Sequence, residues 1–165
     1  MGSKSNIINQ TYGNRLRVRV CGILIEKDKV LMVKHQSIGA SGVFWAPPGG
    51  GMEYGEDAQL TLKREFREET GLEVEVKELL FVNEYLNKPL HGIELFFEVK
   101  SRGGTLKKGH DPEMSVKDQI IESVEWLDID KINAMPSSHL HNAFWELGDL
   151  NKIFEKKGYI KRTQY

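Results

Sequence analysis

The chain has 165 residues, with 23 Lys and Arg against 24 Asp and Glu, a formal net charge of −1, and a single cysteine. This length suits one domain with a substantial core, and the near-neutral charge disfavours a nucleic-acid partner. One cysteine excludes an internal disulfide, and the sequence shows neither an apolar run of about 18 residues nor a signal-peptide pattern. We therefore expect a cytoplasmic protein without a membrane partner.

The first part of the chain is expected to form a sheet. Residues 1–14 are polar and rich in Asn, which predicts a flexible segment before a single domain at residues 15–160 and a tail at 161–165. Strands are predicted at residues 17–25, 30–33 and 43–45, where apolar residues alternate or run together. A turn is predicted at 26–29, between the first two strands.

A helix is predicted between Asp57, a candidate N-cap, and Gly71, which has the position of a glycine just past a helix end. Ala58, Leu62 and Phe66 recur at helical spacing and should form its buried stripe. Before the helix, the glycine run at 49–51 can bring bare backbone close to a ligand.

The rest of the domain should contain further strands, then short helices. The strands are expected at residues 72–76, 79–85, 93–99 and 120–127, with a long polar loop at 101–117 that has the length of a functional loop. Helical segments are expected from Asp128, from Ser137 or Ser138 to Leu147, and over 150–157.

Glu65, Glu68 and Glu69 form an unusual cluster on the predicted central helix. Residues three and four apart share a helix face, so these carboxylates repel one another. They also lie toward the C-terminal end, where the helix dipole disfavours each by about 0.3–1 kcal/mol. A bound cation would reverse both effects, and carboxylate oxygens suit Mg²⁺, with Mn²⁺ as a substitute.

The glutamates belong to a longer spacing pattern. It reads Gly50, five positions, Glu56, seven positions, Arg64-Glu65-Phe66, one position, Glu68-Glu69, one position, Gly71-Leu72. This pattern resembles the Nudix box, and segments 45–50 and 124–127 also look like that family. The resemblance implies an α/β fold, a Nudix-type α/β/α sandwich with a mixed β-sheet. It also implies a hydrolase that cleaves nucleoside-linked diphosphates with a divalent metal.

The resemblance assigns roles to residues in and near the box. It implies that Glu65 and Glu69 are metal ligands, that Glu68 is a further ligand or a base, and that the Gly49 carbonyl completes the coordination. Arg64 and Glu56 would orient these groups through an ion pair. The general base stays open between Glu65 and Glu68 on the helix and Glu113 or Glu122 beyond it.

Substrate contacts are assigned to a wider set of residues. Arg17 and Arg19 lie on one side of a strand and could meet a phosphate or face water. Aromatic residues near the box could stack on a base, and the five histidines and Cys21 are expected to have packing or surface roles. The substrate-binding candidates are Arg19, Trp45, Gly50, Gly51, Tyr85, Glu113 and Glu122.

The expected function is metal-dependent hydrolysis of a diphosphate linkage in a nucleoside diphosphate derivative, such as ADP-ribose or a nucleoside triphosphate. The alternative is a catalytically silent Nudix-fold module that senses nucleotides. Pro89 stands 17 residues after Leu72, two beyond the spacing of a proline found in ADP-ribose hydrolases of the family, so the sequence leaves the substrate open. The partner is a small-molecule nucleotide, and the family's frequent dimers leave a homodimer open.

Overall fold

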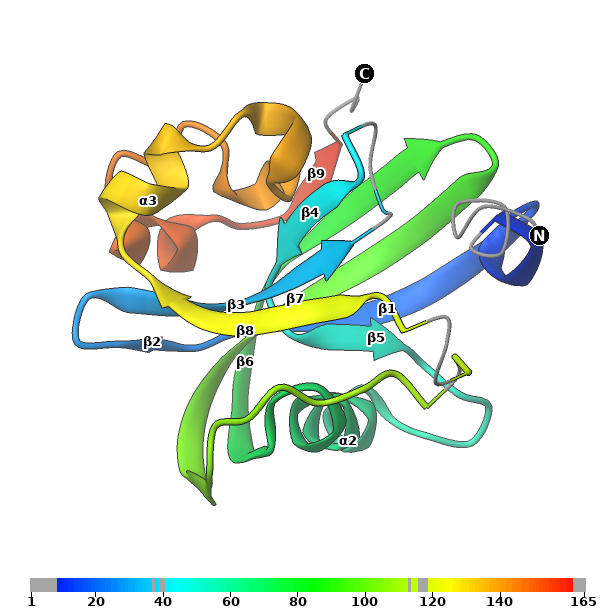
Figure 1. Cartoon of the computed structure of the whole chain (residues 1–165), viewed down its shortest axis with the longest axis horizontal. Helices are drawn as coiled ribbons and strands as arrows, with labels where there is room; N and C mark the ends of the chain where they lie inside the picture. Colours follow the sequence, from blue (N-terminus) through cyan, green and yellow to red (C-terminus); the bar gives the residue numbers. More distant parts are fainter. Residues whose placement is uncertain (1–8, 37, 39–40, 113, 116–118, 162–165) are drawn as a thin grey trace.

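The computed structural model describes residues 9–36, 38, 41–112, 114–115 and 119–161, and their strands form two sheets (Figure 1). The first sheet has the order β5-β1-β7-β6-β9, formed by Gly49–Gly51 (β5), Arg15–Ile23 (β1), Leu90–Gly104 (β7), Leu72–Asn87 (β6) and Tyr159–Lys161 (β9). The second contains Ile25–Glu26 (β2), Lys29–Gln36 (β3) and Val43–Ala46 (β4), with Ile121–Leu127 (β8) paired to β3.

Helical elements cover the sheets from two sides (Figure 1). Helix α2 (Ala58–Thr70) packs on one side, over a core that contains Val20, Leu62 and Phe66. The other side carries α3 (Ile129–Ala134) and three short 3₁₀ helices, Ser137–His139 (η1), Asn142–Phe144 (η2) and Leu150–Glu155 (η3). Because β1 and β7 are parallel while β6 and β7 are antiparallel, the sheet is mixed, and the expected α/β/α sandwich is confirmed.

The termini of α2 agree with the sequence prediction. The Asp57 side chain accepts a hydrogen bond from the Leu60 N–H at 2.8 Å, which satisfies one of the free donors at the start of the helix. Gly71 has φ 73°, and its N–H donates to the Arg67 carbonyl. Leu62 and Phe66 are fully buried, so the predicted apolar stripe faces the core.

The glycine run expected to approach a ligand belongs to the first sheet. Gly49–Gly51 forms β5, which pairs antiparallel with β1. A Cβ on Gly50 would lie 2.2 Å from Glu65 Oε1, and one on Gly49 would lie 2.0 Å from the Val20 carbonyl oxygen. The missing side chains therefore let this backbone approach the protein's own helix and strand.

Four elements differ from prediction. The two strands predicted over 72–85 are one strand, β6, because register shifts between Val76 and Phe81 absorb the break in alternation. The predicted helix to Leu147 is wrong, because extended backbone at Leu140 and Trp145 divides that segment into 3₁₀ turns. Residues 9–12 form a helical turn within the segment expected to be flexible, and β9 was not predicted.

The predicted long loop has a structural task at the end of α2. The first residues of the predicted loop belong to strand β7, and the segment that follows lies against the C-terminus of α2. Its backbone N–H groups bond the last helical carbonyls, Lys107 to Thr70 at 2.9 Å, Gly109 to Glu69 at 2.9 Å and His110 to Glu68 at 3.3 Å. These donors satisfy carbonyls that a helix end leaves without partners.

Gly109→Ala should destabilise the fold. A Cβ at this position would lie 1.7 Å from the Glu68 carbonyl oxygen, so the loop must move away from α2. We expect a loss of about 1–3 kcal/mol in the free energy of unfolding, measured by urea denaturation. Gly148→Ala is the control, because a Cβ there has nothing within 4 Å. Equal stability of the two variants would contradict this packing.

Candidate active site

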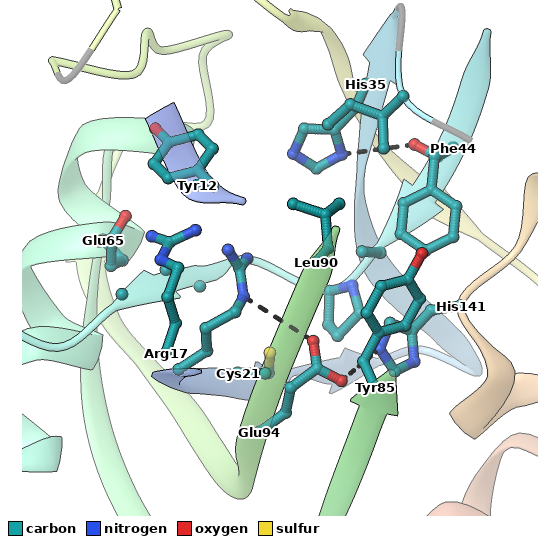
Figure 2. A pocket seen from close by; sticks show the side chains of 18 of the residues that line it. Tyr12, Arg17, Cys21, His35, Phe44, Glu65, Tyr85, Leu90, Glu94 and His141 are labelled. Carbon is teal, nitrogen blue, oxygen red and sulfur yellow. Dashed lines mark hydrogen bonds and ion pairs between the residues drawn. The ribbon is translucent and has the colours of Figure 1, made fainter. Parts of the chain in front are cut away.

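A cavity of about 710 Å³ opens beside α2, β1 and β7. Its lining comes from elements far apart in the sequence, including β1, β5, α2, β7 and the C-terminal 3₁₀ turns. Figure 2 shows Glu65 and Arg17 on one side of the cavity and Tyr85 and His141 on the other. The two sides therefore differ in chemistry.

Arg64 organises the acidic side. Its Nε and Nη2 each donate a hydrogen bond of 3.0 Å to the Glu56 carboxylate, which gives the predicted ion pair a bidentate geometry. Its Nη1 bridges the helical glutamates, at 2.9 Å from Glu65 Oε1 and 3.2 Å from Glu68 Oε2. One guanidinium therefore fixes three carboxylates.

Glu69 is the most buried carboxylate of the cluster, with 7% of its surface exposed. The Gly49 N–H donates to its Oε2 at 2.9 Å and fixes its orientation. Burial, the Glu65 charge and the nearby Asp111 raise the pKa of Glu69 well above its usual range. Burial also raises the pKa of Glu65 to about 7, although Arg64 and Arg19 oppose the shift.

This donor set fits a divalent cation by its chemistry. Glu65, Glu68 and Glu69 supply hard carboxylate oxygens, and their burial and mutual repulsion are the penalties that a cation would remove. Arg64 supplies positive charge between Glu65 and Glu68. Within the described ranges no three acidic, histidine or cysteine side chains converge into a ready-made metal site.

Arg17 and Arg19 provide positive charge next to the cluster. They are two residues apart on β1, so both side chains project from the same face of the sheet into the cavity. The Arg17 guanidinium lies over the Tyr12 ring, 4.0 Å from its centroid, in a cation–π contact. Arg19 is close enough to Glu65 and Glu69 to influence the pKa of each.

A second acidic group, Glu94, lies on β7 at the other side of the cavity. The strand register places Arg19, Glu94 and Asn83 in one row across β1, β7 and β6. Asn83 Nδ2 donates to Glu94 Oε2 at 2.8 Å, and Arg19 Nε lies 3.7 Å from Glu94 Oε1.

His141 completes the surroundings of Glu94. It is the N-cap of η2, where its Nδ1 accepts a hydrogen bond from the Ala143 N–H at 3.1 Å. The neutral ring must then carry its proton on Nε2, which lies 2.8 Å from Glu94 Oε2 and donates to it. A short helical turn thereby sets the histidine tautomer.

His35 lines the cavity from β3, with its Nδ1 3.3 Å from the Phe44 carbonyl oxygen. Burial and the Arg19 charge lower the pKa of His35 to about 4, even though hydrogen bonds to the backbone favour the charged form. The ring is therefore neutral at pH 7.

Most residues predicted for the site meet in this cavity. Arg19, Gly49, Gly50, Gly51, Arg64, Glu65, Glu68, Glu69 and Tyr85 line it, and Glu56 supports Arg64 from behind. Trp45 is not brought there, because its side chain packs in the core beneath β4. Glu122 is not brought there either, because it pairs with Lys34 at 2.7 Å on the exposed side of β8. Glu113 lies outside the described residues.

Three cavity residues had no signal in the sequence that assigned them to a site. Glu94 looks like an ordinary polar position in an alternating strand, and His141 and Asp111 lie in segments without a motif. Only the parallel pairing of β1 with β7 places Glu94 beside Arg19. That pairing joins distant segments and cannot be read from local periodicity.

Comparison with known proteins adds a family match. Residues 14–145 match the NUDIX domain. The chain is 38% identical over 96 residues to an ADP-ribose pyrophosphatase of Methanocaldococcus jannaschii, a match that covers 57% of this chain and 56% of that protein. It is 35% identical over 104 residues to an 8-oxo-dGDP phosphatase of Mus musculus, covering 60% of this chain and 31% of that protein. The chain therefore spans about half or less of the length of these two relatives.

Solved structures of other proteins share the fold of this chain. A NUDIX hydrolase from Nitrosomonas europaea superposes with a TM-score of 0.69 at 20% identity, covering 86% of this chain and 89% of that one. An ADP-ribose pyrophosphatase from Streptococcus suis superposes with a TM-score of 0.60 at 16% identity, covering 87% and 98%. Among the described residues, no helix is long and apolar enough to cross a membrane.

Mg²⁺ should stabilise the fold through the acidic cluster. At about 100 times its Kd, the ion should add roughly 2.7 kcal/mol and raise Tm by about 5 °C or more, measured by differential scanning fluorimetry at pH 8. Glu69→Gln should lose this rise and melt higher than the wild type in EDTA, because one repelling charge is removed. Glu122→Gln is the control and should keep the rise. A full Mg²⁺ response in Glu69→Gln would contradict the assignment.

His35 should make the fold sensitive to acid. Its folded pKa, about 4, is below the unfolded value of 6.5, so the unfolded chain binds more protons in this window and stability falls as pH drops from 6.5 to 4. The full pKa difference corresponds to about 3 kcal/mol, and partial exposure of the ring reduces the expected loss to about 2 kcal/mol. Urea denaturation at both pH values should show a smaller loss in His35→Gln, and equal losses would contradict this role.

Proposed function

Because the chain belongs to the Nudix family, we propose that it hydrolyses a diphosphate linkage in a nucleoside diphosphate derivative, using a divalent metal and water. One observation carries the proposal: the three clustered carboxylates of α2 and the arginines Arg17 and Arg19 of β1 line the same cavity. A diphosphate needs positive charge around its oxygens, and a hydrolase of this type needs oxygen ligands for a cation. The cavity supplies both.

Glu65, Glu68 and Glu69 would hold Mg²⁺ or Mn²⁺, with the Gly49 carbonyl as a further ligand. The bound ion would neutralise phosphate charge and lower the pKa of water. The protein's own part is to hold these oxygens in place. Arg64 does so for Glu65 and Glu68, and the Gly49 N–H does so for Glu69. Such orienting partners commonly change metal affinity or activity by about 10–100-fold.

Arg17 and Arg19 would bind the phosphate oxygens that face away from the carboxylates. Arginine suits this task because its planar fork donates two parallel hydrogen bonds to one phosphate. Tyr12 holds the Arg17 guanidinium at 4.0 Å from its ring centroid, which limits the side chain's freedom before the substrate arrives.

The proton of the attacking water has several candidate acceptors. Glu65 and Glu68 remain candidates from the helix, and Asp111 joins them because it lines the cavity close to Glu69. Asp111 follows the loop segment that Gly109 anchors to α2. That anchor therefore bears on activity as well as stability.

The relatives narrow the choice of substrates to test. The relative from Methanocaldococcus jannaschii is named an ADP-ribose pyrophosphatase, and the relative from Mus musculus is named an 8-oxo-dGDP phosphatase. ADP-ribose and 8-oxo-dGDP are both nucleoside diphosphate derivatives. The cavity volume of about 710 Å³ is in the usual range for small-molecule sites. We propose ADP-ribose and related nucleotide sugars, with nucleoside triphosphates as the second group.

Glu69→Gln should reduce turnover roughly 100-fold or more, since it removes a metal-facing charge and preserves shape. The measurement is release of phosphate, pyrophosphate or nucleoside monophosphate from ADP-ribose, 8-oxo-dGDP and the common nucleoside triphosphates with Mg²⁺. Glu122→Gln is the matched control and should keep full activity. Nucleotide binding without product release by the wild type would contradict the proposed hydrolysis, as would full activity in Glu69→Gln.

A further inference from the structure

Glu94 is an ionised carboxylate in the cavity that the proposed hydrolysis does not use. Glu94 is 6% exposed and forms ion pairs with Arg19 and His141, and Figure 2 shows Glu94 beside His141. Burial favours its neutral form, but His141, Arg19 and Asn83 together hold its pKa below the usual value. The negative charge of Glu94 would repel the phosphates of the proposed substrate, so the hydrolysis does not explain why this carboxylate faces the cavity.

The two carboxylate oxygens of Glu94 differ in their partners. Oε2 accepts hydrogen bonds from Asn83 Nδ2 and His141 Nε2, each at 2.8 Å. Oε1 faces Arg19 Nε at 3.7 Å, which is an ion pair beyond hydrogen-bonding distance. In the described part of the chain, Oε1 therefore has acceptor capacity left for a ligand.

We propose that Glu94 Oε1 accepts a hydrogen bond from the exocyclic amino group of the substrate's nucleobase, so that Glu94 determines base specificity. This rests on one part of the proposed function, namely that the cavity binds a nucleotide. The carboxylate repels phosphate, so this side of the cavity takes an uncharged part of the substrate that donates a hydrogen bond. Phe44, Tyr85 and Trp145 also line the cavity and offer aromatic surfaces to a planar ring, and Figure 2 shows Phe44 and Tyr85 on the side of His141.

An amino group fits this position better than a carbonyl or a ring N–H. A carbonyl would place an acceptor against a charged acceptor, which leaves both without a donor. A ring N–H lies recessed between its neighbouring substituents, whereas an amino group projects from the ring. The Glu94 side chain is only 8% exposed, so a projecting donor reaches Oε1 more easily.

The surroundings of Glu94 predict what a glutamine side chain would do in its place. Asn83 and His141 both donate toward the Oε2 position, so the amide of the Glu94→Gln variant should place its carbonyl oxygen at that position. The NH₂ group of the amide would then take the position of Oε1. Glu94→Gln therefore converts the free acceptor into a donor without changing the shape of the side chain.

The test compares substrates that differ by an amino or an oxo group at one position, ADP-ribose with IDP-ribose and CTP with UTP. We expect the wild-type kcat/KM to favour the amino member roughly tenfold or more, and Glu94→Gln to reverse or abolish this preference. Glu98→Gln is the matched control on β7, since Glu98 is outside the cavity lining and should keep the wild-type ratio. A comparison of each nucleotide with its 2′-deoxy form tests whether Glu94 contacts a sugar hydroxyl instead of the base.

The inference is overturned if the ratio of kcat/KM between amino and oxo substrates in Glu94→Gln lies within about twofold of the wild-type ratio. It is also overturned if Glu94→Gln changes only the discrimination between ribonucleotides and 2′-deoxynucleotides. If Glu94→Gln fails to fold, calorimetry on the wild type compares AMP with IMP and CMP with UMP, and equal affinities would overturn it. If AMP binds more tightly than IMP while no substrate is hydrolysed, the proposed function fails and the base inference stands.

Discussion

The crowding of Glu65, Glu68 and Glu69 at the end of α2 is the constraint on which the rest of the site depends. Their charges repel one another at the negative end of the helix, and burial adds to the penalty. The surrounding structure counters this locally, since Arg64 bridges two of the carboxylates and the Gly49 N–H bonds the third. Backbone donors from the loop after β7 satisfy the helix carbonyls beneath them.

The cavity contains two acidic regions with different tasks. On one side are the helical glutamates, whose buried charges suit a cation and a diphosphate. On the other is Glu94, whose hydrogen bonds to Asn83 and His141 keep one oxygen directed to a neutral donor. Arg19 lies between the two sides and interacts with acids of both. This order of charges would orient a nucleotide with its phosphates toward α2.

The sequence predicted what depends on local spacing and missed what depends on distant pairing. The caps of α2, its buried stripe and its carboxylate face follow from the helical period, and all lie where expected. Trp45 and Glu122 were predicted to contact the substrate. Strand alternation instead directs the Trp45 side chain into the core and the Glu122 side chain toward Lys34. Glu94 meets Arg19 because β7 pairs parallel to β1, and it meets His141 because η2 returns to the sheet. No local signal encodes either contact.

The carboxylate cluster should admit a diphosphate only when a divalent cation lies between the two. This requirement can be measured by calorimetric titration with the α,β-methylene analogue of ADP-ribose, in Mg²⁺ and then in EDTA. We expect the affinity to fall roughly tenfold or more in EDTA, because phosphate oxygens then face uncompensated carboxylates. Equal affinity under both conditions would contradict it.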